Sequence, residues 1–92
     1  MQVRVTRTFK KSLKKLVKKH YDKAKLIEVI ELIKHGDNET LVRQFNCHLL
    51  KGDKMGIYEL HLERNWLLLY QIIGTNQLVL LLVNTGNHDI LR

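Results

Sequence analysis

Histidine and glutamate are the residue types in this sequence that could carry proton transfer. Glu59 and His61 stand two residues apart in an alternating stretch, and a β-strand would turn both side chains to the same face. His48 precedes that stretch, and His88 follows the last apolar segment. Because an unperturbed imidazole titrates at about pH 6.5, a cluster of such rings could supply both a base and an acid near neutrality.

Phosphodiester cleavage in RNA is a reaction that needs these parts. A base removes the proton of the 2′-hydroxyl, the freed oxygen attacks the adjacent phosphorus, and an acid protonates the departing 5′-oxygen. A cation or hydrogen-bond donor stabilises the negative phosphorane. A curled sheet could bring the three histidines to one concave surface. Unrelated surface histidines are the plainer interpretation.

A zinc site is another interpretation of the three histidines, with Cys47 as a fourth ligand. However, the sequence lacks the paired spacings typical of zinc ligands, such as C-x-x-C or H-E-x-x-H. Adjacent residues such as Cys47 and His48 also seldom bind one ion together. The cleavage scheme itself requires no metal, so we expect neither a metal nor another cofactor.

Two helices and a first strand are predicted to precede these residues. Alternation over residues 3–5 indicates a short strand. Thr8 is suited to cap a helix in which apolar residues recur at helical spacing between lysines. Apolar residues between positions 26 and 33 indicate a second helix, which is predicted to end at Gly36. Residues 37–56 are polar and contain two glycines, so they are predicted to form a loop.

Three strands are predicted to follow. Residues 57–63 alternate between apolar and polar, residues 66–73 are apolar on both faces, and residues 78–83 form a third apolar segment. The order β-α-α-β-β-β predicts one α+β domain over residues 1–92, with an antiparallel sheet and both helices packed on one face. The polar residues of the first of these three strands are then left to solvent or to a substrate.

Basic residues are concentrated near the N-terminus. The chain has 16 Lys and Arg against 9 Asp and Glu, a net charge of +7. Residues 1–25 hold ten of these cations and one acid, whereas residues 26–92 hold six cations and eight acids. A one-sided cationic surface attracts polyanions, so nucleic acid is the leading partner and an acidic protein segment the second. A lysine face that serves only solubility is the alternative.

Cysteine content and hydropathy indicate the compartment. Cys47 is the only cysteine, which excludes an intramolecular disulfide and fits a reducing cytoplasm. The first residues lack the apolar segment of a signal peptide, and the longest apolar run, residues 78–83, is too short to cross a bilayer. We therefore expect a cytoplasmic protein.

Residues 48–70 carry a pattern that resembles the YafQ group of the RelE toxin superfamily. The pattern is H-x-L-x-G-x-x-x-G-x-x-x-x-H-x-x-x-x-W-x-L-x-Y, and the later run Thr85-Gly86-Asn87-His88 resembles the T-G-x-H motif that closes this family. The first strand and the two lysine-rich helices also match the family architecture. The resemblance therefore covers nearly the whole chain.

The resemblance implies the toxin of a type II toxin–antitoxin system. Such toxins cut messenger RNA in the ribosomal A site, without a metal, through attack by the 2′-hydroxyl. A cognate antitoxin of the DinJ or RelB kind, with a ribbon-helix-helix start, holds them inactive. The complex of the two proteins represses its own operon by binding operator DNA.

The resemblance also assigns roles to single residues. His48 and His61 match two active-site histidines of the family, and Glu59 stands at an acidic position of the same strand. His88 matches the histidine of the closing motif and is expected to be the general acid. Either His48 or His61 is expected to be the base.

Two positions depart from the family pattern, and both are expected to bind substrate. Asn65 replaces an aspartate before the tryptophan, so it cannot take a proton but can form a hydrogen bond to RNA or to a histidine. Arg92 replaces a terminal phenylalanine, and its guanidinium can stack on a base or neutralise the phosphorane.

Four lysines are further candidates for substrate binding. Lys14, Lys15 and Lys18 belong to the cationic helix, and Lys51 belongs to the predicted loop. Under the toxin hypothesis, the cationic helix could grip ribosomal RNA, or it could serve an acidic antitoxin.

Two other functions are compatible with the sequence. A non-catalytic toxin of the same fold, such as a ParE-like inhibitor of DNA gyrase, would have no use for three histidines. A plain RNA-binding module would use the lysine face from Lys10 to Lys25 and leave the strand uncut.

Overall fold

Three α-helices and five strands make up the described part of the computed structural model, which covers residues 1–19, 21–54 and 56–91. In chain order the elements are β1 (Gln2–Val5), α1 (Arg7–Lys18), α2 (Lys23–Lys34), α3 (Asn38–Phe45), β2 (His48–Leu49), η1 (Gly52–Lys54), β3 (Tyr58–Glu63), β4 (Trp66–Ile73), β5 (Val79–Gly86) and η2 (His88–Leu91), where η marks a short 3₁₀ helix. No helix of these residues is long and apolar enough to cross a membrane.

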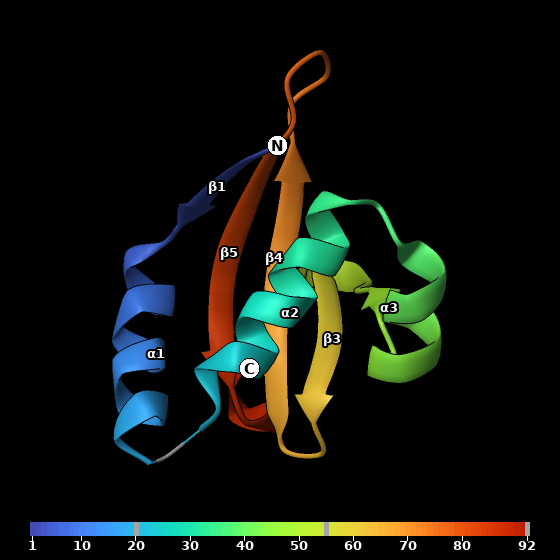
Figure 1. Ribbon diagram of the computed structural model, residues 1–92. Coiled ribbons are helices and arrows are strands. Elements are labelled where there is room, and N and C mark those ends of the chain that lie inside the picture. The colour runs from blue at the N-terminus through green and yellow to red at the C-terminus, as the bar shows by residue number, and fades with distance from the viewer. Residues whose placement is uncertain (20, 55, 92) are drawn as a thin grey trace.

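The five strands form one mixed sheet with the order β1-β5-β4-β3-β2 (Figure 1). The pairs from β5 to β2 are antiparallel, whereas β1 runs parallel to β5, with Gln2 opposite Val79 and Val5 opposite Leu82. The predicted α+β class is confirmed, but the prediction of an antiparallel sheet was wrong for β1. Almost the whole chain lies between β1 and β5, so no hairpin forces an antiparallel pair.

All three helices pack against one face of the sheet. Leu60 and Leu68, from neighbouring strands, are fully buried and share one core cluster with Phe9 of α1, Val29 of α2 and Leu41 of α3. Burial of these apolar side chains is the main favourable term that holds the two layers together. The predicted packing of helices on one face is confirmed, with three helices in place of two.

Side-chain caps begin each helix. The hydroxyl of Thr6 accepts the backbone N–H of Phe9 at 3.0 Å, and the carboxylates of Asp22 and Asp37 cap α2 and α3. The prediction that Thr8 caps the first helix was wrong. Thr6 has the extended backbone that a cap requires, and Thr8 already lies within α1.

The segment predicted to be a loop, residues 37–56, contains α3 and β2. Leu41 and Phe45, one helical turn apart, are buried in the core cluster. Asn46 ends the helix with a left-handed backbone, φ 50°. The loop prediction was wrong because it gave weight to polar residues and glycine and overlooked this apolar pair behind the Asp37 cap.

Candidate active site

The strand register brings two of the predicted histidines and Glu59 together on the sheet face opposite the helices. Leu60 and Leu62 of β3 point into the core, so the alternating Glu59 and His61 point away from the helices. His48 of β2 is the direct cross-strand partner of Glu59, and cross-strand partners share a face.

His88 reaches the same face from the C-terminal end of β5. His61 pairs with Leu67, and Leu67 pairs with Gly86, so the three lie in one row across β3, β4 and β5. After Gly86 the chain enters η2, which begins at His88. The rings of His61 and His88 meet edge to face, with centroids 5.9 Å apart.

The carboxylate of Glu59 is the centre of this histidine cluster, by which we mean His48, Glu59, His61 and His88. Its Oε1 lies 3.0 Å from Nε2 of His61 and 3.7 Å from Nε2 of His48. The side chain of Glu59 is 7% exposed, against 25% for His61 and 46% for His48. A buried acid therefore lies behind two accessible rings, and a proton taken up by either ring stays beside a negative charge.

Hydrogen bonds determine which ring nitrogen of His48 is free. Its Nδ1 lies 2.9 Å from the carbonyl oxygen of Asn46, and a carbonyl can only accept, so Nδ1 donates. Nε2 of the neutral His48 ring then carries the lone pair. An ionised Glu59 also only accepts, so Nε2 of His61 donates to it. The neutral His48 ring thus presents a basic nitrogen at the surface.

Sequence analysis missed the contribution of Asn46. Its left-handed backbone, φ 50°, follows the last turn of α3 and places its carbonyl oxygen at Nδ1 of His48. An asparagine directly after an amphipathic segment is a typical signal for the C-terminal end of a helix. That signal could have identified both the end of α3 and this contact.

Two of the residues predicted to bind substrate, Asn65 and Lys51, lie outside the histidine cluster. Within the described residues, neither Asn65 nor Lys51 forms a hydrogen bond or an ion pair with the histidine cluster. Asn65 lies in the β3–β4 turn and lines a separate open hollow of about 470 Å³ with Lys19 and Trp66. Lys51 is exposed between β2 and η1. Arg92 lies outside the described residues.

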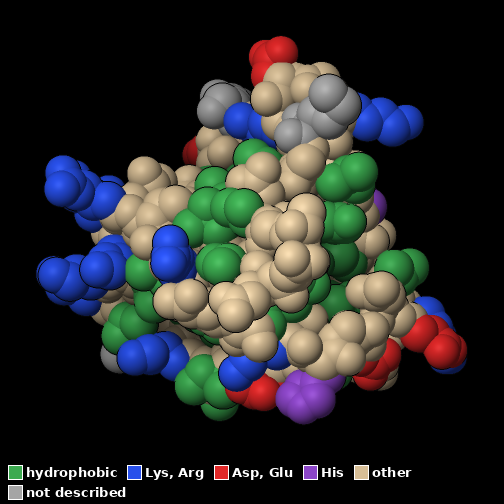
Figure 2. All heavy atoms as spheres, turned by 90° about the horizontal axis from the view of Figure 1, so that it is seen from above, with side chains coloured by type: hydrophobic (Ala, Val, Ile, Leu, Met, Phe, Trp, Pro, Cys, Tyr) green, Lys and Arg blue, Asp and Glu red, His purple; other side chains and the backbone are tan. Residues whose placement is uncertain are grey.

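The predicted cationic face is present on α1. Lys14, Lys15 and Lys18 are exposed there, and in the described residues none of them forms an ion pair with the histidine cluster. Figure 2 shows Lys and Arg side chains gathered on the side of the molecule that α1 occupies, the left in both views. Lys14 and Lys18 line one groove, and Lys15 is not among its lining residues.

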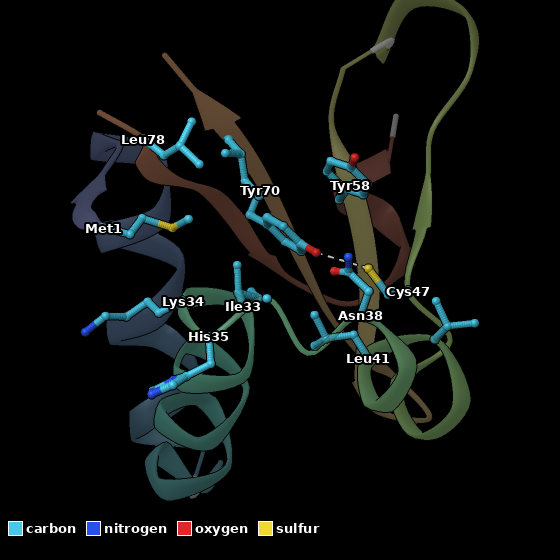
Figure 3. Close-up of a pocket in the computed structure, with 13 residues that line it drawn as sticks. Met1, Ile33, Lys34, His35, Asn38, Leu41, Cys47, Tyr58, Tyr70 and Leu78 are labelled. Atoms are coloured by element: carbon cyan, nitrogen blue, oxygen red, sulfur yellow. Dashed lines mark hydrogen bonds between the residues drawn. The ribbon is translucent and has the colours of Figure 1, made fainter. Parts of the chain in front are cut away.

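A further cavity of about 450 Å³ lies between the C-terminal end of α2, α3 and the sheet (Figure 3). Its lining includes Ile33, Leu41 and Tyr58, but none of the clustered histidines. Sγ of Cys47 lies 3.1 Å from the hydroxyl of Tyr70, and burial raises the pKa of both groups. The thiol is therefore neutral near pH 7 and is a poor nucleophile there.

The described residues contain no group of three or more His, Cys, Asp or Glu side chains arranged to hold a metal ion. Cys47, the fourth ligand of the zinc interpretation, turns its thiol toward Tyr70 of the core and not toward the three rings. These side chains therefore do not fit a metal site, and the expectation of a metal-free reaction stays a prediction.

The sequence matches a family model over residues 1–92, that of the bacterial toxin of type II toxin–antitoxin systems, YafQ. Among curated proteins, no sequence matches this chain. Solved structures are similar in fold. A metal-bound toxin from Helicobacter pylori is 32% identical, with 100% of this chain and 99% of that chain covered and a TM-score of 0.85.

Two Escherichia coli structures are also similar. YafQ from strain BL21(DE3) is 27% identical, with 98% of this chain and 96% of that chain covered and a TM-score of 0.77. A chain of the DinJ–YafQ toxin–antitoxin complex is 26% identical, with 98% and 94% covered and a TM-score of 0.77. The family match spans every element that positions the histidine cluster, from β2 to η2. The chain therefore belongs to the YafQ family of bacterial toxins of type II toxin–antitoxin systems.

Proposed function

We propose that this toxin is an endoribonuclease that cuts messenger RNA on the ribosome, through attack by the 2′-hydroxyl and without a metal ion. The observation that carries the proposal is a cluster of three imidazole rings from β2, β3 and η2, in which His48 and His61 lie beside the buried carboxylate of Glu59 and His88 contacts His61. The fold does not need these polar rings to meet, because they lie outside its apolar core. A scissile phosphodiester does need a base and an acid within reach of one linkage.

His48 is the base in this proposal. Its Nε2 carries the lone pair, and 46% of its side chain is exposed, so a ribose hydroxyl can approach it. After the proton transfer, the imidazolium lies 3.7 Å from Oε1 of Glu59. Glu59 thereby stabilises the positive charge that develops on the base. It acts through the histidines and is a positioning residue.

His88 is the acid. Its ring is exposed on η2, where a protonated imidazole can give its proton to the departing 5′-oxygen. His61 connects the two ends of the cluster, since it donates to Glu59 and contacts the ring of His88. When protonated, His61 adds positive charge beside the phosphorane.

The residues outside the cluster bind RNA and protein partners in this proposal. Lys14, Lys15 and Lys18 neutralise phosphates of ribosomal RNA, and Lys51 and Asn65 contact the messenger. The partner that inactivates the toxin is a cognate antitoxin, as in the DinJ–YafQ complex of E. coli. We expect that antitoxin to be of the ribbon-helix-helix kind, the pair to act in the cytoplasm, and only the complex to bind operator DNA.

The metal-bound state of the similar H. pylori toxin raises the question of a metal in this chain. The described side chains do not form a group of three or more donors arranged for one. In the proposed reaction both proton transfers use imidazole, and no step passes through a metal ion.

Mapping of RNA ends after induced expression tests the proposal. Attack by the 2′-hydroxyl leaves a 2′,3′-cyclic phosphate on one fragment and a 5′-hydroxyl on the other. We expect translated messages to acquire such ends within their coding regions. A double variant, His48→Ala with His88→Ala, expressed to the same level, is the control. Intact messages together with inhibited DNA supercoiling would overturn the proposal in favour of a ParE-like toxin.

A further inference from the structure

The cavity between α2, α3 and the sheet, which we call the tyrosine cavity, has an apolar floor and an aromatic wall. Ile33 of α2 and Leu41 of α3 are buried in its lining. The rings of Tyr58 and Tyr70 stack in it, with centroids 5.3 Å apart and an interplanar angle of 14°. In Figure 3 the ring of Tyr70 points from β4 toward the two helices. The proposed reaction uses none of these residues.

Apolar side chains also surround the mouth of the tyrosine cavity. Val42 of α3, Ile72 of β4 and Leu78 line it and are exposed. Exposed apolar residues gathered around a buried apolar floor are typical of a binding site. The volume of about 450 Å³ lies in the range of about 300–1,000 Å³ that is usual for pockets of small molecules.

The charges at one end of the tyrosine cavity are positive. Lys34 and His35 line it, and an adjoining hollow of about 670 Å³ shares Met1 and Lys34 with it and adds Arg4. Neither space has an Asp or Glu in its described lining. Glu31 lies 3.4 Å from Nζ of Lys34 but lines neither space, and in the described part of the chain Arg4 forms no ion pair. An anion is therefore favoured there over a cation.

We propose that the tyrosine cavity binds a small aromatic anion, namely one or two fused hydrocarbon rings that carry a carboxylate or a sulfonate. The rings would pack against the tyrosines and the aliphatic floor. The anionic group would point toward Lys34 and Arg4, and the amide of Asn38 and the hydroxyl of Tyr58 can donate to it. This inference goes beyond the proposed function and does not depend on it.

Larger or more polar occupants fit the tyrosine cavity less well. An α-helix of twelve residues, about 18 Å long and 10 Å across, occupies roughly 1,400 Å³, about three times the volume of the cavity. A nucleobase would bring several hydrogen-bonding groups to a lining that is mostly aliphatic and aromatic, and each group left without a partner costs free energy. A flat hydrocarbon ring with one charged group avoids both problems.

Titration of the purified, ¹⁵N-labelled full chain tests the inference by NMR. The three probes share one ring system: 2-naphthoate is an anion, 2-naphthalenemethanol is neutral and 2-naphthalenemethylamine is a cation. We expect 2-naphthoate to bind with a Kd on the order of 1 mM or tighter, and to shift the backbone amides of Ile33, Leu41 and Ile72. The neutral probe should bind about fivefold more weakly, and the cation more weakly still.

Two variants test the place of binding. Val42→Trp puts a large ring at the mouth of the tyrosine cavity and should weaken binding of 2-naphthoate at least about tenfold. Ile27→Trp is the matched control, because Ile27 lies on α2, is 58% exposed against 57% for Val42, and does not line the cavity. It should bind 2-naphthoate within about twofold of the parent chain. Circular dichroism confirms that each variant is folded.

Two further variants test the charge. Lys34→Gln should remove most of the difference in affinity between 2-naphthoate and 2-naphthalenemethanol. Lys10→Gln, an exposed cation of α1 that does not line the cavity, should leave this difference unchanged.

Three results would overturn the inference. The first is the absence of saturable binding of 2-naphthoate up to about 5 mM. The second is equal affinity for the three probes, or equal losses in Val42→Trp and Ile27→Trp. The third is a set of shifted amides centred on Leu13 and Val17, because the aromatic anion would then bind the lysine-lined groove of α1 and not the tyrosine cavity.

Discussion

Nε2 of His61 lies 3.0 Å from Oε1 of Glu59, and the same oxygen lies 3.7 Å from Nε2 of His48. Glu59 is 5% exposed overall, and its carboxylate makes polar contacts with both of these rings. A buried carboxylate is costly without such partners. The carboxylate of Glu59 and the two imidazole rings therefore form one polar contact network.

Glu59→Gln should slow RNA cleavage. The amide keeps the shape of the side chain but cannot stabilise an imidazolium as a carboxylate does. We expect the single-turnover rate on ribosome-bound messenger to fall by roughly tenfold to a hundredfold. Glu28→Gln, at an exposed position of α2, is the matched control. A rate equal to that of the parent chain would remove the carboxylate from the mechanism.

His88→Ala should reduce cleavage more strongly, because it removes the group that protonates the leaving oxygen. The expected loss is about 10²–10⁴ in the same single-turnover assay. Affinity for the antitoxin, measured by calorimetry, should stay at the level of the parent chain. His35→Ala is the control, since the side chain of His35 is 75% exposed at the end of α2 and lies outside the cluster. Equal rates for the two variants would mean that His88 is not the acid.

Chelation should leave the reaction unaffected. If imidazole carries both proton transfers, dialysis against EDTA should change the rate on ribosome-bound messenger by less than about twofold, once the Mg²⁺ that ribosomes need has been restored. Purified toxin analysed by mass spectrometry for Zn²⁺ and Cu²⁺ serves as the control. Loss of activity on chelation, followed by its return only with a transition metal, would contradict the metal-free mechanism.

Much of the histidine cluster could be predicted from the sequence. The alternation of β3 places Glu59 and His61 on one face whatever the rest of the fold, because a strand has a side-chain period of two. The position of His88 depends on the turn that follows β5. A Cβ on Gly86 would lie 2.8 Å from Cγ2 of Ile90, so the turn into η2 packs against β5 at a site that glycine leaves open. A curled sheet made His88 a candidate for this surface, and the resemblance to the closing motif of the family gave it the role of the acid.

Other features could not be derived from local patterns. Val3 and Val5 alternate as in any strand, and this alternation does not reveal that β1 pairs in parallel with β5, the strand that α1 also contacts. Which ring nitrogen of His48 carries the lone pair depends on the hydrogen bond from Nδ1 to the carbonyl oxygen of Asn46. That carbonyl is in reach because α3 ends at Asn46. Both features arise from tertiary structure, on which periodicity carries no information.

Thr85→Val should destabilise the fold. The Thr85 hydroxyl accepts the indole N–H of Trp66 at 2.8 Å and donates to the carbonyl of Leu67 at 2.7 Å, and both side chains are buried. Valine has nearly the same shape but leaves the indole N–H without an acceptor. We expect the free energy of unfolding to fall by about 1–3 kcal/mol in urea titrations. Thr75→Val, in the exposed β4–β5 turn, is the control, and equal losses in both variants would contradict this account.

Cys47 and Tyr70 should make the stability depend on pH in the alkaline range. Burial raises the pKa of Cys47 above its ordinary value of 9.0, although the hydrogen bond with Tyr70 lowers it in part. Burial, and then that same hydrogen bond, raises the pKa of Tyr70 above 10.0. Both groups hold their protons more tightly in the folded state than in the unfolded chain. Their contribution to stability is therefore complete below about pH 9 and is lost as the pH rises above it.

Tyr70→Phe separates this effect from general alkaline denaturation. Phenylalanine has no hydroxyl to deprotonate when the chain unfolds, so the decline in unfolding free energy between about pH 8 and pH 10.5 should be shallower than in the parent chain. The variant should also be less stable near pH 8, because the hydrogen bond with Cys47 is lost. Tyr21→Phe, whose ring packs edge-on against Trp66 at 5.1 Å, is the matched control. Parallel declines for Tyr70→Phe and the parent chain would show that the buried hydroxyl does not govern alkaline stability.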